Sequence, residues 1–381
     1  MMNVEKAPKS KIEQKKEMEV SPEYVQVAER ALKGYLQLKS EEKVLLIKDR
    51  DTDGKTAVIL EKAIDAIGSS RKEFMLSKKS KKEEILQLLQ KYETIISISA
   101  GDYGTSDDIY DDIKETKNRF LALLDIDKEA FKPGGALEEN PAELVERLNR
   151  MEALLSRARG FKITSVYGTD LNIPIRPLGE RRWIKETGVL NPGEWGNLPV
   201  GEIYTTPDET RTNGTLMLPV LESTIKTHQG VDEFVKLTIK DGVIVAIDGG
   251  KSAEVLRDQL AKESKESEKE YNDPWAPYRI AEMGFGANSK ARGVVADPDK
   301  SYRRAGVSVV EAEKRFGTIH LAFGDAKHGD EGAEGFHTAS SHYDFVIPRN
   351  GLTVEMFTSE QDFDKKNKGQ KIINDGGINF F

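Results

Sequence analysis

Apolar and polar residues in the first third of the chain alternate between short runs and helical spacings. Residues 21–38 begin Ser-Pro-Glu and then place apolar residues at helical spacing, which predicts an amphipathic helix with Ser21 as N-cap and Pro22 at N1. Three apolar runs predict short buried strands, and two helical patterns separate them. The runs are 43–48, 73–76 and 94–100, and the helical patterns are 57–67 and 85–92. Alternating strands and helices predict parallel βαβ units.

The pattern changes after a strong helix that begins at a capping box. Asn140-Pro141-Ala142-Glu143 precedes apolar residues at helical spacing up to Leu155. Beyond residue 160 the segments alternate as strands do, and Asp241-Gly242 between two alternating runs predicts a tight hairpin. Residues 256–271 are dense in charge and predict a solvated helix.

These patterns predict an α/β protein with two domains. Residues 20–160 are expected to form an N-terminal α/β domain with a parallel sheet. Residues 161–381 are expected to form a mixed, largely antiparallel C-terminal α+β domain that binds metal. Residues 1–19 mix lysines and glutamates without an apolar core, so they predict a disordered charged tail.

Composition narrows the possible chemistry. The chain has 381 residues and no cysteine, which excludes disulfides, thiolate nucleophiles and Cys-type zinc sites. Its formal net charge of −8 argues against a nucleic-acid partner. No apolar run is long enough to span a bilayer and no secretory signal is evident, so a cytoplasmic protein without a membrane partner is expected.

Two glycine-containing segments resemble ligand-binding motifs without completing them. In DRDTDGKTA (49–57) the twelfth position of a calcium loop is Leu60 instead of glutamate, and the first glycine of a phosphate loop is replaced by Asp49. A polar turn between strand and helix is therefore expected there. The segment GFGAN (284–288) has too few glycines for a dinucleotide-binding fingerprint.

Histidines and carboxylates gather near the C-terminal end. Side chains alternate across a strand, so His342 and Asp344 share one face of the strand SSHYDFVI, while Tyr343 and Phe345 share the other. His320 in GTIHLAFG alternates with core residues in the same way. Two such strands side by side would bring three metal ligands together. From spacing alone, satisfied core histidines remain about equally plausible.

Four blocks in order resemble the aminopeptidase T and aminopeptidase S family of metallopeptidases. A fifth segment, YGTDL (167–171), precedes them and resembles the family more weakly. The four blocks are NLPVGEIYTTPDETRTNGTL (197–216), IAEMGFGAN (280–288), GTIHLAFGD (317–325) and SSHYDFVI (340–347).

That resemblance implies a dinuclear metallo-aminopeptidase, a hydrolase that removes the N-terminal residue of a peptide with metal-activated water. The implied metal ligands are Glu202, Glu282, His320, His342 and Asp344. Three carboxylates and two imidazoles suit two divalent ions, with Zn²⁺ expected and Co²⁺ or Mn²⁺ as alternatives. The resemblance also implies a homodimer and a peptide as the partner substrate.

Four further residues are weaker candidates. Glu311 and Glu313 precede the His320 strand and are candidates for a general base, with solvent-facing edge carboxylates as the alternative. His328 and His337 lie in a glycine-rich segment expected to cover the site, where they are candidates for gripping substrate.

Two other classes stay open. One is a mononuclear iron dioxygenase of the ring-cleaving dihydroxypyridine type, which resembles the same superfamily and would use His320, His342 and Asp344. The other is a non-catalytic homologue that serves as a binding protein. Glu202 and Glu282 favour the hypothesis of a two-metal site, because a single ion has less need of two more carboxylates.

Overall fold

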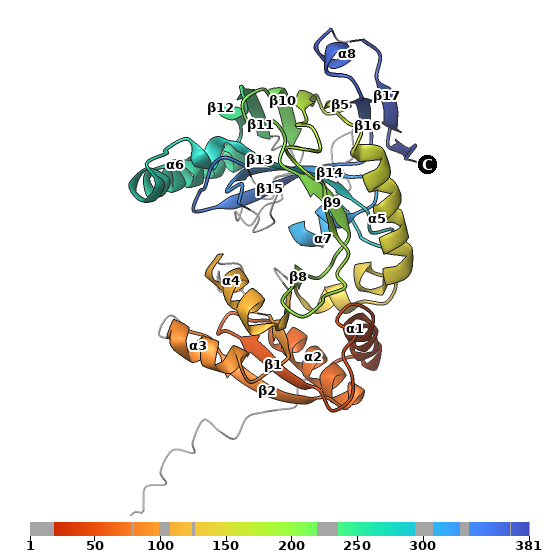
Figure 1. The fold of residues 1–381 in the computed structure, drawn as a ribbon, viewed down its shortest axis with the longest axis vertical. Helices are drawn as coiled ribbons and strands as arrows, with labels where there is room; N and C mark the ends of the chain where they lie inside the picture. The colour runs from red at the N-terminus through yellow and green to blue at the C-terminus, as the bar shows by residue number, and fades with distance from the viewer. Residues whose placement is uncertain are drawn as a thin grey trace, which may run out of the picture.

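The computed structural model describes residues 19–77, 80–98, 107–123, 126–218, 235–293, 308–327, 335–365 and 367–380. The predicted N-terminal tail, apart from its last residue, and His328 lie outside these ranges. The α/β class is confirmed, because a parallel sheet, four of whose five strands lie within residues 43–122, is followed by two antiparallel sheets within residues 160–378 (Figure 1).

The first sheet has the strand order β2-β1-β3-β4-β8 and all its pairs are parallel. Its strands are β1 Lys43–Lys48, β2 Ser70–Met75, β3 Thr94–Ser97, β4 Arg119–Ala122 and β8 Trp195–Asn197. Its helices are α1 Pro22–Gly34, α2 Gly54–Ile67, α3 Lys82–Leu89 and α4 Asp107–Thr116. Val44 and Leu46 belong to the core cluster of α1 and α2, whereas Leu45 and Ile47 belong to the cluster of α3 and α4. Helices therefore cover both faces, which explains the continuous apolar strands.

Residues 49–53 form the polar turn that was expected, and residues 54–57 begin α2. Asp53 caps α2, because its side chain accepts hydrogen bonds from the backbone N–H and the hydroxyl of Thr56 at 2.8 and 2.9 Å. Asp49 accepts from the backbone N–H of Asp51 within the turn. These carboxylates serve local backbone structure.

The second sheet is antiparallel and has the order β12-β11-β10-β6-β5-β16-β17-β18. Its strands are β5 Gly160–Ser165, β6 Asp170–Pro174, β10 Asn213–Leu218, β11 Val235–Lys240, β12 Val243–Gly249, β16 Leu352–Phe357, β17 Gln370–Asn374 and β18 Gly377–Ile378. The predicted hairpin joins β11 to β12. Asp241 and Gly242 have φ values of 50° and 78°, as the turn requires.

The third sheet is also antiparallel, with the order β15-β14-β13-β9-β7. Its strands are β7 Ile184–Glu186, β9 Glu202–Thr205, β13 Ile280–Gly286, β14 Ile319–Gly324 and β15 His342–Ile347. One face packs on the second sheet, where the ring of Phe161 in β5 lies 5.6 Å from that of Phe285 in β13. The opposite face carries the polar residues described below.

Seven further helices complete the described part of the fold. α5 Pro141–Leu155 is capped by Asn140, whose side chain accepts hydrogen bonds from the backbone N–H groups of Ala142 and Glu143, as expected of an N-cap residue. α6 Lys251–Tyr271 projects from the second half of the molecule (Figure 1). The short helices are η2 Lys128–Phe131, η3 Ala136–Glu138, η4 Ala276–Tyr278, α7 Val309–Lys314 and α8 Glu360–Asp364.

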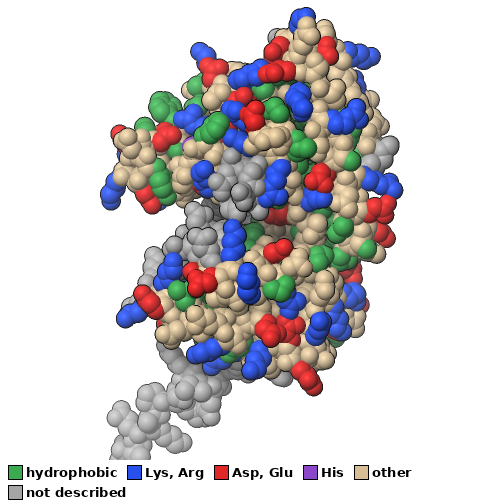
Figure 2. Space-filling view, viewed as in Figure 1, with side chains coloured by type: hydrophobic (Ala, Val, Ile, Leu, Met, Phe, Trp, Pro, Cys, Tyr) green, Lys and Arg blue, Asp and Glu red, His purple; other side chains and the backbone are tan. Residues whose placement is uncertain are grey.

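The two halves share strands and core. The boundary near residue 160 stays a prediction, and β8 shows that a segment beyond it completes the first sheet by pairing with β4. Figure 2 shows basic and acidic side chains interspersed over both halves, with the surface hollowed between them on the side of α4 and α6. Among the helices of the described ranges, none combines the length and the hydropathy that a membrane span needs. The homodimer and the cellular compartment stay predictions.

Candidate metal centre

Four strands of the third sheet present polar side chains on one face. β13 pairs with β9 and β14, and β14 pairs with β15. Strand alternation sends Ile319 and Leu321 to the core and His320 to the opposite face, as expected. Glu202, Glu282, His320, His342 and Asp344 come together on this face, although 142 positions separate the first from the last.

His320 lies at the centre of the cluster. Its Nε2 is 2.8 Å from Oε1 of Glu282 and 3.3 Å from Oε2 of Glu202. One donor atom from each of these three buried residues lies within 4.8 Å of the others. Within the described ranges, the Glu202 Oε2 and His320 Nδ1 atoms are buried and have no hydrogen-bond partner. A buried carboxylate oxygen without a hydrogen-bond partner, close to an imidazole nitrogen, is an arrangement suited to binding a cation.

His342 extends the cluster toward solvent. Its Nε2 lies 3.8 Å from Glu282 and 3.7 Å from Asp344, and its side chain is 30% exposed. Its Nδ1 lies 2.8 Å from the carbonyl oxygen of Asp325. A carbonyl only accepts, so Nδ1 carries a proton and donates it, which leaves Nε2 to face the carboxylates. This orientation is the one that metal-binding histidines use.

The pKa values of the histidines and of Asp344 show a strong demand for positive charge in this cluster. Burial alone lowers the pKa of His320, but the charge of Glu202 and the hydrogen bond to Glu282 outweigh it and raise the pKa to about 10. Burial also lowers the pKa of His342, and the charge of Asp344 raises it to about 10. Burial raises the pKa of Asp344, but the charge of His342 holds it well below its usual range. Two imidazolium ions thus compensate the carboxylates, a role that a metal ion can take over.

Two glycines make room for the cluster. Gly284 of β13 lies opposite His320 of β14 in the register. A Cβ at Gly284 would lie 2.1 Å from Cε1 and 2.2 Å from Nε2 of His320, so only glycine fits beneath the ring. A Cβ at Gly286 would lie 2.1 Å from the carbonyl oxygen of Arg315. The segment GFGAN therefore has a role, although it is no dinucleotide motif.

A buried lysine beside the cluster was missed by sequence reasoning. Lys314 of α7 donates hydrogen bonds to Glu202 and, at 2.8 Å, to Glu313, and its Nζ lies 3.6 Å from Glu186. Burial lowers its pKa, but Glu202 and Glu313 raise it well above its usual range. Burial raises the pKa values of Glu186 and Glu313 to about 8, although Lys314 opposes the shift. Nothing in the sequence EAEKRFG (311–317) distinguishes this buried lysine from one exposed to solvent.

The weaker candidates occupy different surroundings. Glu311 and Glu313 are 1% and 5% exposed, so the alternative of solvent-facing edge carboxylates is wrong. They lie in α7, which buries both. Glu311 accepts two hydrogen bonds from the side chain of Arg292, an arrangement that fits a structural role. The catalytic and substrate-binding assignments of these residues stay predictions.

His337 lies in the segment that leads to β15. It is 7% exposed, so its side chain is buried. Burial and the charge of Arg279 lower its pKa to about 4. It is therefore a neutral imidazole at physiological pH. His328 lies outside the described ranges.

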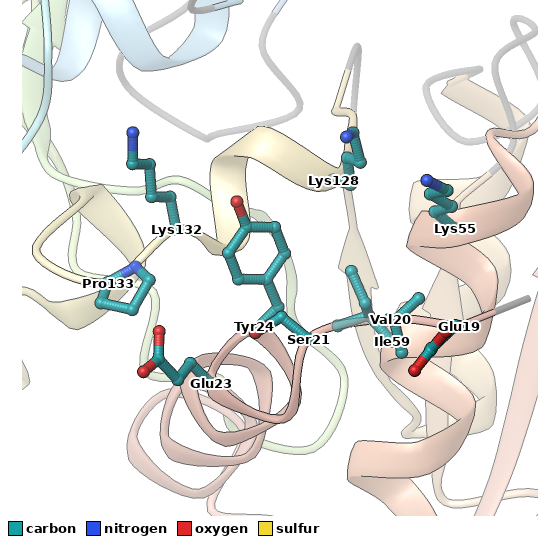
Figure 3. A pocket seen from close by; sticks show the side chains of 10 residues that line it. All are labelled: Glu19, Val20, Ser21, Glu23, Tyr24, Lys55, Ile59, Lys128, Lys132 and Pro133. Carbon is teal, nitrogen blue, oxygen red and sulfur yellow. The ribbon is translucent and has the colours of Figure 1, made fainter.

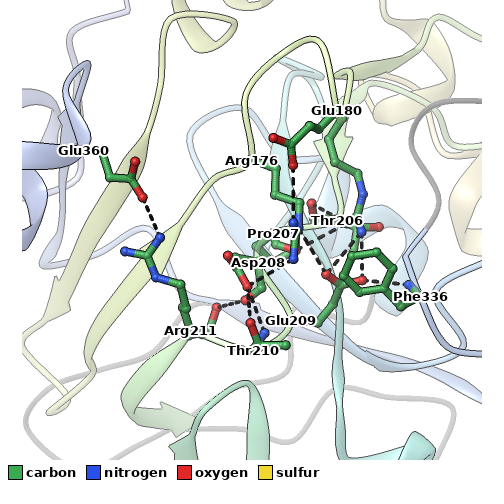
Figure 4. A network of polar contacts seen from close by, with 12 residues as sticks. Arg176, Glu180, Thr206, Pro207, Asp208, Glu209, Thr210, Arg211, Phe336 and Glu360 are labelled. Carbon is green, nitrogen blue, oxygen red and sulfur yellow. Dashed lines mark hydrogen bonds and ion pairs between the residues drawn. The ribbon is translucent and has the colours of Figure 1, made fainter.

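A buried ion pair anchors the same segment. Arg181 donates to both oxygens of Glu209 at 2.9 and 3.2 Å, and the backbone N–H of Phe336 donates to the same carboxylate at 2.8 Å (Figure 4). The guanidinium groups of Arg176 and Arg181 lie 4.6 and 5.1 Å from the Phe336 ring centre. This network holds the chain six residues before His342.

A separate cavity of about 420 Å³ lies at the first sheet's helices (Figure 3). Its lining includes Tyr24 of α1, Lys55 of α2 and Lys128 of η2. None of the predicted site residues lines it. The candidate site is therefore the polar face of the third sheet.

Comparison with known proteins identifies a family and a sequence relative of the dioxygenase class. The model of the family NicX, 2,5-dihydroxypyridine 5,6-dioxygenase, matches residues 111–355. A 2,5-dihydroxypyridine 5,6-dioxygenase of Pseudomonas putida is 33% identical over 147 residues, which are 38% of this chain and 39% of that protein. The alignment thus spans about two fifths of the relative's length.

Two solved structures share the fold. The 2,5-dihydroxypyridine dioxygenase from Pseudomonas putida KT2440 has a TM-score of 0.63 at 19% identity, covering 93% of this chain and 96% of that one. Wild-type AmpT from Thermus thermophilus has a TM-score of 0.58 at 15% identity, covering 93% and 98%. The resemblance to aminopeptidase T therefore holds at the level of the fold.

These matches correct the functional expectation. The main hypothesis of a dinuclear aminopeptidase, and with it the terms hydrolase and protease, is wrong, because the family model and the sequence relative are dioxygenases, which are oxidoreductases. The expected pair of zinc ions is also wrong, since a dioxygenase of this type uses one iron. Glu202, one of the carboxylates that favoured two ions, has a cationic partner in Lys314. The chain belongs to the NicX family, whose model is described as 2,5-dihydroxypyridine 5,6-dioxygenase.

Proposed function

We propose that this protein is an iron-dependent dioxygenase that opens a dihydroxypyridine ring or a closely related hydroxylated aromatic ring. The observation that carries the proposal is the convergence of two imidazoles on one shared carboxylate, Glu282, in a chain of the dioxygenase family. Neutral nitrogen and carboxylate oxygen donors suit non-haem iron(II).

His320, His342 and Asp344 are the residues that would hold the ion, and His320 also belongs to the group with Glu202 and Glu282 whose donor atoms lie within 4.8 Å of one another. Glu282 lies between the two imidazoles, with one oxygen 2.8 Å from His320 and the other 3.8 Å from His342. It is positioned either to complete the coordination or to accept a proton from a hydroxylated substrate. When bound, iron supplies the one-electron chemistry that lets dioxygen react with an aromatic ring.

The surroundings favour a substrate that approaches from the His342 side. His320 is 1% exposed and the Glu282 side chain 7%, whereas the His342 and Asp344 side chains are 30% and 23% exposed. The carboxylates beside the ion have no bulk water on the His320 side, which strengthens their hold on protons and cations.

Activity can be tested directly. Metal-free protein reconstituted with Fe²⁺ without oxygen, then mixed with 2,5-dihydroxypyridine and air, should consume oxygen and substrate in equal amounts. His342→Ala should lower turnover more than about 100-fold, because the loss of a ligand exceeds the roughly 10–100-fold effect typical of outer partners. Its circular dichroism should match that of metal-free wild type. The proposed function would be rejected if the iron-loaded protein consumed no oxygen but released aminoacyl reporters in a metal-dependent reaction.

A further inference from the structure

The Lys314 ammonium is enclosed by the protein next to the candidate metal centre. The side chain is 2% exposed and faces three carboxylates, which are Glu186 of β7, Glu202 of β9 and Glu313 of its own helix. A buried charge is tolerated only when its partners compensate it. Three acidic partners from three elements form a built binding site for one cation, and the lysine side chain fills it.

Glu202 links this lysine to the metal centre. Its Oε1 accepts a hydrogen bond from Lys314, and its Oε2 lies 3.3 Å from Nε2 of His320. In two-metal sites the ions lie about 3.5–4 Å apart, close enough for acidic ligands to be shared between them. Here the cation on the Oε1 side is an ammonium that belongs to the chain.

We propose that Lys314 permanently occupies the position of a second metal ion, so that the centre accepts a single dication. A cation already hydrogen-bonded to Glu202 and Glu313 takes their negative charge and repels another cation at the same place. The dinuclear geometry of a two-metal hydrolase is thereby closed to this chain. The inference deepens the proposed function and rests on it, since a one-iron dioxygenase needs a site that takes one ion.

The number of bound ions tests this directly. Metal-free wild type dialysed against saturating Mn²⁺, and separately against Zn²⁺, should bind one ion per chain by elemental analysis. Lys314→Met keeps the length of the side chain but removes its charge, which leaves Glu202 and Glu313 for a second ion. We expect this variant to bind two ions per chain. Lys33→Met, at a lysine whose side chain is 51% exposed on α1, is the matched control and should bind one.

Each result decides the matter. Two ions in the wild type, or one ion in a folded Lys314→Met variant, would overturn the proposal. If Lys314→Met does not fold even when purified with metal, the wild-type count alone decides, with one ion in support and two against. Ion counting needs no turnover, so a chain that binds one ion but fails to open a dihydroxypyridine ring would reject the proposed function and keep this inference.

Discussion

His337 illustrates how one buried side chain can make stability depend on pH. Its pKa is lowered to about 4 in the folded chain, first by burial and then by Arg279, from an ordinary value of 6.5. Between these two values the unfolded chain binds a proton that the folded chain excludes, so stability is lost as the pH falls. Above pH 6.5 the imidazole is neutral in both states and the penalty vanishes.

We therefore expect His337→Gln to flatten the acid side of the stability curve. From about pH 7 to about pH 4.5 the wild type should lose about 2–3 kcal/mol more of its free energy of unfolding than the variant, as the shift in pKa requires. Urea unfolding at both pH values, with metal-free protein, measures this difference. Equal losses in the two proteins would show that His337 takes up its proton without cost.

Some residues of the candidate site could be predicted from the sequence and others could not. The HxD pair and the His320 strand were predictable, because alternation fixes which side chains share a face. The place of Lys314 was not, since it depends on the end of α7 lying beside β7 and β9, two strands that come much earlier in the chain. The predicted number of metal ions was wrong for the same reason, because the sequence did not place Lys314 beside Glu202.

Among the elements, the β13 and β14 pair controls the position of His320. Gly284→Ala would place a methyl group 2.2 Å from Nε2 of His320, so the ring must move. We expect stability to fall by about 1–3 kcal/mol from overpacking. Metal binding should weaken by about 10–100-fold, the loss typical when the orientation of a metal ligand is disturbed.

A matched glycine separates this effect from a general cost of alanine. Gly179 has no heavy atom within 4 Å of the point that a Cβ would occupy, so Gly179→Ala should leave both properties unchanged. Thermal unfolding and metal titration of the two variants provide the measurements. Unaltered metal affinity in Gly284→Ala would mean that His320 does not bind the ion.

The loop network tests a second element, the segment before β15. Arg181→Met leaves the Glu209 carboxylate, 1% exposed, without its two-point partner, which should cost about 3–5 kcal/mol. Arg176→Met is the control, because that side chain is 20% exposed and its ion pairs, at 3.3–3.6 Å, are longer. It should cost less than about 1 kcal/mol. Urea unfolding of both variants would refute the argument if the two losses were equal.

Regular elements were predictable where their pattern was long. The strand at 43–48, the capping box at Asn140 and the Asp-Gly hairpin all occur as expected. β7 and β8 were missed, because three-residue strands are too short for alternation to show. β8 exists because β4 offers it an open edge, which is a tertiary cause.

At the scale of the whole molecule, several contacts tie the two halves together. Asn288, completely buried, donates to the carbonyl oxygens of Ala136 and Val200 at 3.0 and 2.8 Å. Arg147 of α5 donates to the carbonyl of Ala287 at 2.6 Å. One continuous core cluster contains residues of α1, α5 and all three sheets. A fold joined in this way should lose both halves at once.

We therefore predict one cooperative unfolding transition, despite a length that favours two domains. Trp195 in β8 reports on the first sheet, and Trp183, whose ring lies 6.2 Å from that of Phe161, reports on the other two. Variants that keep only one of these tryptophans, with Trp275 also replaced, should each show the same urea midpoint by fluorescence and by circular dichroism. Separate midpoints within either variant would mean that the halves unfold independently. The shared core would then be too weak to couple the metal centre to the first sheet, and bound metal should raise only the Trp183 transition.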